Sequence, residues 1–177
     1  MQFTATHHQR ILAIDLRPKQ FGYAVFEGPK RLLDMGGASY RPGGVVGAAA
    51  ARRSIVRLAS VFLPSVIVVK RIRQKISRNS PGVEPILRAI RSEAVSRSIP
   101  VCLITRKEIR EVFSAFRSKN KYEIATMLVR IFPELLWKLP PERKFYESEH
   151  PGMSAFDAVA LGYTFWHRAN ADIPAPE

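Results

Sequence analysis

The first forty residues alternate between apolar runs and turn residues. Apolar, β-branched and aromatic residues fill 9–16 and 21–26, and a short loop containing Pro18 separates the two runs. Two such runs joined by a short loop predict a β-hairpin. Residues 31–40 predict a third strand, which ends at the turn sequence RPGG (41–44). Because the three runs follow one another closely, we expect an antiparallel meander.

The rest of the chain alternates between helical and strand-like patterns. Apolar residues recur at helical spacing through 44–63, and Pro64 ends this stretch. Two short continuous apolar runs, 65–69 and 101–105, are typical of buried parallel strands. Further helices are predicted at 83–97, 106–116, 121–132 and 154–169.

This order of elements predicts an α/β protein with a mixed five-stranded sheet flanked by helices. Strands that alternate with helices join a sheet in parallel, so the later strands should extend the meander. That is the plan of the ribonuclease H-like fold. We expect one domain over 1–177, with a core of about 10–168 and a frayed C-terminal tail.

The apolar content, the cysteine count and the lengths of the apolar runs indicate which class of protein this is. The chain is 46% hydrophobic and has one cysteine, Cys102, so no internal disulfide can form. No apolar run approaches the roughly 18–20 residues that cross a bilayer, and the first ten residues do not resemble a signal peptide. These features predict a cytoplasmic protein without a membrane partner.

Charge points to a polyanionic partner. Lys and Arg number 28 against 15 acids, which gives a net charge of +13. A domain this basic most often binds nucleic acid, although a solubilising surface or an acidic protein or membrane partner gives the same composition. The candidate phosphate contacts are the five basic residues of 70–78 and one in the cluster 117–121. They are Lys70, Arg71, Arg73, Lys75, Arg78 and Lys119.

Two aspartates stand where chemistry is possible. Asp15 follows the apolar run RILAI, and Asp157 lies near the start of the last predicted helix. In this architecture such acids can meet above the sheet and hold two Mg²⁺ or Mn²⁺ ions, which clamp a phosphodiester during hydrolysis. Each also has a structural explanation. Asp15 suits a turn aspartate, and Asp157 completes a capping box if Ser154 is the N-cap.

The ordered motifs resemble the RuvC-type Holliday junction resolvases over about residues 10–165. They are ILAID…GYAVFEG, PSVIVVK, SIPVCLITRKEIREVF, NKYEIATMLVRIFPEL and SAFDAVALGY. Residues 139–161 look closest to uncharacterised RuvC-like bacterial proteins. The resemblance implies a metal-dependent endonuclease that cuts branched DNA in recombination and repair. It also implies a homodimer, because these enzymes act as two-fold dimers on a two-fold junction.

The resemblance also implies roles for individual residues. Asp15 matches the first catalytic acid, Asp157 the final one, and Lys121 a lysine near the substrate phosphate. Two positions depart from the family pattern. Lys70 stands where the family has Glu, and Ser154 where it usually has His or Asp. A protonated lysine cannot ligate Mg²⁺, and its charge would repel or replace an ion.

Loop acids offer substitute ligands. Glu147 and Glu149 precede the last helix and could turn toward Asp15, with Glu149 also a candidate catalytic acid. Two solvated loop acids are the simpler interpretation. His150 is near enough to serve as a ligand or a base, although a surface histidine is commoner.

Lys70 leaves a second function open, namely a catalytically degenerate nucleic-acid-binding module in which this lysine replaces a metal ligand. A third candidate, a sugar-kinase or actin-like ATPase, is disfavoured by the short chain and the absence of an early glycine after Asp15. Phe113, Phe116 and Tyr122 flank a basic cluster and could stack on unpaired bases, or they could belong to the core.

Overall fold

Five strands form one sheet in the order β3-β2-β1-β4-β5, with β1 at its centre. The computed structural model describes residues 9–18, 20–39, 45–71, 83–118, 120–144 and 146–169. The strands are β1 Arg10–Leu16, β2 Gln20–Glu27, β3 Leu32–Ser39, β4 Val66–Lys70 and β5 Val101–Ile104. The first three pair antiparallel, whereas β4 and β5 run parallel to β1. The mixed five-stranded sheet predicted from the sequence is confirmed.

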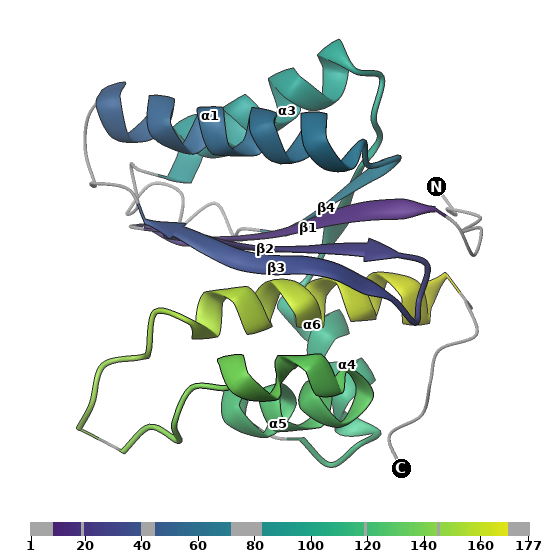
Figure 1. Ribbon diagram of the computed structural model, residues 1–177, viewed down its shortest axis with the longest axis vertical. Coiled ribbons are helices and arrows are strands. Elements are labelled where there is room, and N and C mark those ends of the chain that lie inside the picture. The colour runs from purple at the N-terminus through teal and green to yellow at the C-terminus, as the bar shows by residue number, and fades with distance from the viewer. Residues whose placement is uncertain are drawn as a thin grey trace.

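Helices cover both faces of this sheet (Figure 1). One face packs against α1 (Val45–Phe62) and α3 (Val83–Ser96), and the other packs against α6 (Met153–Arg168). Outside α6 lie α4 (Arg106–Ser114), α5 (Lys121–Ile131) and the short 3₁₀ helix η1 (Pro133–Lys138).

Alternation along β1 divides the core into two layers. Ile11 and Ala13 belong to the layer beneath α6, whereas Leu12 and Ile14 belong to the layer beneath α1 and α3. Successive side chains of a strand point to opposite faces, so Asp15 shares the face of Ile11 and Ala13. The α6 face therefore changes from apolar to charged at the carboxyl end of β1.

Close approach of α6 to the sheet depends on two glycines. A Cβ atom on Gly22 of β2 would clash with the backbone carbonyl of Ser154 in the first turn of α6. A Cβ atom on Gly162, in the middle of α6, would enter the ring of Phe26. Since Gly22 is the register partner of Asp15, this contact sets the first turn of α6 beside Asp15.

Two local predictions were wrong. Helix α6 begins at Met153 with Gly152 as its N-cap, and the Ser154 hydroxyl donates to the Pro151 carbonyl at 2.9 Å. Ser154 is thus inside the helix, and it forms no capping box with Asp157. Strand β5 was expected to be buried, but it forms an edge of the sheet and leaves Leu103 exposed.

Candidate functional site

Asp15 and Lys70 come together at the carboxyl ends of two neighbouring parallel strands. The register pairs Ile14 with Val69, so the next residue of each strand, Asp15 and Lys70, lie side by side. Val66 and Val68 belong to the α6 layer, and alternation therefore turns Lys70 toward the same face as Asp15. Lys70 Nζ donates a hydrogen bond to Asp15 Oδ1. The lysine points into the site rather than away from it.

Arg17 occupies the middle of the cluster. It follows Asp15 by two residues, and its Nε donates to Asp15 Oδ2 at 3.1 Å. Its other two nitrogens reach residues that are more than 130 positions away in the sequence. Nη1 donates to Glu149 Oε2 at 2.7 Å, and Nη2 donates to Asp157 Oδ2. One guanidinium thus contacts all three acids.

Lys121 closes the outer side of the cluster. It is the first residue of α5, which Asn120 caps through a capping box with Glu123. Lys121 Nζ donates to Glu149 Oε1 at 2.7 Å and to Asp157 Oδ2 at 3.0 Å. We call the group the acid–base cluster. Its six members are Asp15, Arg17, Lys70, Lys121, Glu149 and Asp157.

The cluster is electrically balanced and partly buried. Three carboxylates face three cations, and Asp15 is only 1% exposed. Burial acts to lower the pKa of Arg17, but the charges of Asp157, Asp15 and Glu149 together outweigh it and raise that pKa. Arg17 therefore carries a fixed positive charge at the place where the acids meet.

These residues do not fit a two-metal centre. Hard divalent cations need free carboxylate oxygens, yet both oxygens of Asp15 accept hydrogen bonds from cationic side chains. A bound ion would have to expel the Arg17 guanidinium and the Lys70 ammonium. Within the described part of the chain, no group of three His, Cys, Asp or Glu residues is arranged to hold a metal ion.

Other predicted ligands lie outside the acid–base cluster. Glu147 is exposed, and its carboxylate accepts a hydrogen bond from the Lys144 backbone at 3.0 Å. His150 is also exposed, and its Nδ1 accepts from the Gly152 backbone at 3.1 Å. The structure thus brings Glu149 to the other acids but not Glu147.

The predicted phosphate contacts can be placed only in part. Arg71 is exposed and directly follows Lys70. The remaining four, Arg73, Lys75, Arg78 and Lys119, lie outside the described residues.

The aromatic residues separate into core and surface. Phe113 is fully buried against Tyr163, and Trp166 and Phe165 are buried in the α6 layer. Phe116 and Tyr122 are half-buried. Of the three aromatic residues predicted to stack on bases, Phe116 and Tyr122 are therefore the two that a ligand can reach.

Arg17 is the member of the cluster that the sequence interpretation missed. The signal was present, because Asp15 and Arg17 are two residues apart at the end of a strand and share one face. Pro18 follows at once, so Arg17 falls in the predicted loop between the first two strands, whereas Asp15 belongs to the predicted strand.

The architecture is that of the RuvC-type Holliday junction resolvases, as the ordered motifs predicted. No family model matches the chain, and no curated protein matches it by sequence. RuvC of T. thermophilus in complex with a Holliday junction substrate superposes with a TM-score of 0.68. It is 20% identical, over 92% of this chain and 97% of that one.

Two further solved structures share the fold. A second structure of RuvC from Thermus thermophilus gives a TM-score of 0.67 at 19% identity, over 94% of this chain and 100% of that one. The yeast mitochondrial Holliday junction resolvase Ydc2 gives 0.59 at 16% identity, over 92% of this chain and 79% of that one. Among the described helices, none has the length and apolar character needed to cross a membrane.

Proposed function

We propose that this protein binds branched or otherwise structured DNA and does not cut it through a two-metal centre. The observation that carries the proposal is the pairing of both Asp15 oxygens, one with Lys70 and the other with Arg17. The two cations supply the positive charge that metal ions supply in a RuvC-type nuclease. They cannot activate a water molecule as a metal ion does.

DNA binding is supported by charge and by fold. The net charge of +13 favours a polyanion, and release of counterions from the phosphates would drive association. One of the solved relatives was captured with a Holliday junction substrate. Branched DNA is therefore the form that we propose for this chain.

The cluster offers the DNA backbone a fixed set of cations. Lys121 is 45% exposed, and Lys70 is 29% exposed, so both can reach a phosphate at the surface. Their carboxylate partners orient them, while the exposed Arg71 extends the basic surface from the end of β4. A phosphate can contact Lys70 directly, as a point charge.

The test combines binding and cleavage. Labelled four-way junction, splayed and duplex DNA are incubated with the protein in Mg²⁺ or Mn²⁺, and the Asp15→Asn variant is assayed in parallel. We expect binding that weakens steeply with salt, preference for the junction, and no cleavage by either protein. Metal-dependent cleavage by the wild type that is lost in Asp15→Asn would overturn the proposal.

A charge-matched pair of variants locates the DNA surface. Arg71→Gln removes one charge beside the cluster, whereas Arg31→Gln removes one from the β2–β3 turn at the opposite end of the sheet. Loss of one phosphate contact should lower the slope of log K against log salt by about 1 in Arg71→Gln only. An equal change in both variants would show non-specific attraction.

A metal-dependent endonuclease is the second candidate function. The observation that favours it is the convergence of Asp15, Glu149 and Asp157 on one guanidinium, since such acids would otherwise be ligands. Cleavage requires Arg17 and Lys70 to leave Asp15 when DNA or a partner binds. The same cleavage assay decides between the two candidates.

A further inference from the structure

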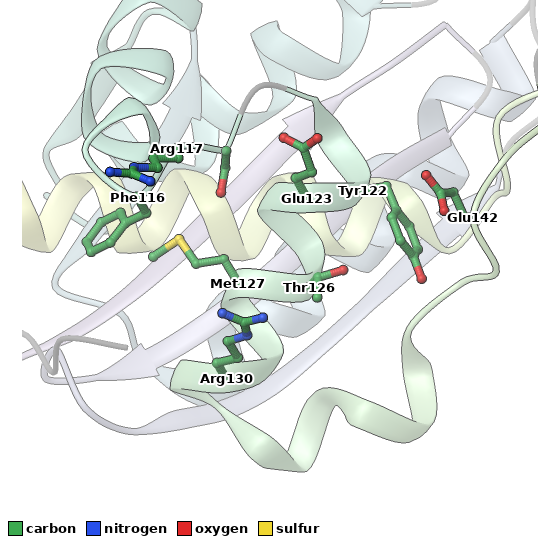
Figure 2. A pocket seen from close by; sticks show the side chains of 9 residues that line it. Phe116, Arg117, Tyr122, Glu123, Thr126, Met127, Arg130 and Glu142 are labelled. Atoms are coloured by element: carbon green, nitrogen blue, oxygen red, sulfur yellow. The ribbon is translucent and has the colours of Figure 1, made fainter. Parts of the chain in front are cut away.

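A pocket of about 450 Å³ opens beside α5, away from the central part of the sheet. It lies between the turn that follows α4 and the exposed face of α5 (Figure 2). Its volume falls within the range of small-molecule sites. No residue of the acid–base cluster lines it, so the pocket is a separate feature.

The lining combines aromatic and apolar side chains with two arginines and two glutamates, Glu123 and Glu142. Phe116 and Tyr122 lie at opposite ends of the lining, and Met127 lies between them (Figure 2). Arg117 and Arg130 are exposed at its edge. Aromatic faces stack on nucleobases, and guanidinium groups bind phosphates in a bidentate manner. The aromatic side chains are therefore suited to the base of one nucleotide, and the arginines to its phosphate.

Thr126 provides an unsatisfied polar group in the same pocket. Its Oγ1 atom is buried and has no hydrogen-bond partner among the described residues. Buried hydroxyl groups are nearly always paired, and an exception calls for a missing partner. Because this oxygen has almost no accessible surface, Thr126 serves as a reporter of the pocket rather than as a direct contact of the base.

Arg117 is held in a backbone conformation that favours glycine. Its φ is 59°, and hydrogen bonds from Arg117 N to Ser114 O and from Ser118 N to Phe113 O form a Schellman motif. Glycine is the usual residue at this position. A glycine at this position would keep the same turn without strain, so Arg117→Gly removes the guanidinium and leaves the backbone in place.

The pocket is connected to the acid–base cluster. A second pocket of about 290 Å³ is lined by Lys121 and Glu149 of the cluster and also by Tyr122 and Glu142. Tyr122 and Glu142 line the first pocket as well. A DNA strand whose phosphate lies at Lys121 can thus place a neighbouring nucleotide across Tyr122.

We propose that the pocket formed by Phe116, Arg117, Tyr122, Thr126 and Arg130 binds one unpaired nucleotide of a structured DNA. The base stacks against the aromatic side chains, and the phosphate contacts the arginines. This inference rests on the proposed function, because it names the part of the DNA that the protein selects.

The test compares two labelled four-way junctions that differ by one unpaired adenosine near the crossover. Stacking of one base predicts about tenfold tighter binding of the bulged junction by the wild type. Arg117→Gly should lose most of that gain while its melting temperature stays the same or rises. Ser98→Gly is the matched control, since Ser98 has φ 55° and ends α3 in the same motif.

Two outcomes with the junctions decide the inference, and a third decides the proposed function. Retention of the preference in Ser98→Gly and its loss in Arg117→Gly supports it, and equal affinity of the wild type for both junctions overturns it. If neither junction binds more tightly than duplex DNA, the proposed function fails instead. NMR titration with deoxyadenosine monophosphate then tests whether the pocket binds a nucleotide independently of the junction. A shift of the Thr126 methyl signal that is absent in Arg117→Gly supports the site, and no shift overturns it.

Discussion

The two ends of α6 both carry ion pairs, but the pairs differ in burial and in number of partners. At the first turns, Asp157 contacts Arg17 and Lys121 within a six-membered cluster that includes the buried Asp15. At the last turn, Arg168 contacts Glu108 of α4 at 2.7 Å, and the arginine side chain is 48% exposed. The same helix thus ends in a network on one side and in a simple surface pair on the other.

Stability can explain the surface pair at the last turn of α6, but it does not explain the cluster at the first turns. An exposed pair contributes about 0–1 kcal/mol and costs little to form. The attraction within a partly buried cluster must offset the desolvation of six charged groups. Apolar residues of similar volume at the same positions often give a more stable fold. Stability alone therefore does not account for the cluster, and we infer that its charges serve a ligand.

The largest change in stability is expected from Gly22→Ala, because the first turn of α6 could then no longer pack closely against β2. The new Cβ atom meets backbone atoms of Ser154 that cannot move independently of the helix. We expect a loss of about 4 kcal/mol in the free energy of unfolding, more than the usual overpacking cost of about 1–3 kcal/mol. Urea denaturation measures it.

Gly152→Ala is the matched control, because its new Cβ atom would lie 3.1 Å from the movable His150 side chain. A change there as large as that of Gly22→Ala would contradict the role of close packing.

The second effect is expected from Asp15→Asn, which breaks the cluster without changing its shape. Lys70 and Arg17 would lose a charged partner, so we expect destabilisation by about 2 kcal/mol in the presence of a chelator. In a metal centre without its ions, the same change would relieve repulsion between acids and stabilise the fold. The sign of the change in thermal unfolding therefore separates the two kinds of site.

Asp34→Asn is the control, because Asp34 accepts only a neutral hydrogen bond from Tyr23 at 3.0 Å in the contacts described. It should change the free energy of unfolding by less than about 1 kcal/mol.

Replacement of two cations should convert the acid–base cluster into a metal site. Removing its two central cations in Arg17→Gly/Lys70→Glu leaves four acids and Lys121. This variant should bind Mg²⁺ and gain about 1.4 kcal/mol in stability when Mg²⁺ is at about ten times its Kd. Thermal unfolding with and without Mg²⁺ measures the gain. An equal gain in the wild type would show that the native cluster already admits the ion.

The smallest effect is expected at the other end of α6. Burial acts to raise the pKa of Glu108, but hydrogen bonds from Thr105 and the charge of Arg168 outweigh it and lower that pKa. The resulting stability is present above the unfolded pKa of about 4.3 and is lost as the pH falls through the lower folded value. Glu108→Gln should remove this pH dependence and cost about 0.5 kcal/mol at pH 7. The free energy of unfolding of wild type and Glu108→Gln, measured by chemical denaturation from about pH 3 to about pH 7, tests this prediction.

The fold could be predicted because hydrophobic periodicity controls it. Apolar runs in β1, β2 and β4 and helical spacing in α1 and α6 all agree with the observed elements. Edge position is a property of the assembled sheet, and β5 therefore looked as buried in the sequence as β4.

The site could be predicted only in part. Asp15, Asp157, Glu149, Lys121 and Lys70 were singled out, and the structure brings them together. The direction of Lys70 depends on strand register, which a short apolar run does not reveal. Arg17 depends on a contact with Glu149 more than 130 residues away, and the start of α6 depends on its packing against Gly22.

Binding of Mn²⁺ to the wild-type protein, followed by the electron paramagnetic resonance signal of the free ion, tests the central claim most directly. We predict no Mn²⁺ binding that depends on Asp15, because Arg17 and Lys70 already occupy both of its oxygens. Wild type and Asp15→Asn should then give the same titration. Stoichiometric binding by the wild type that disappears in Asp15→Asn would contradict the account and restore a metal-dependent nuclease.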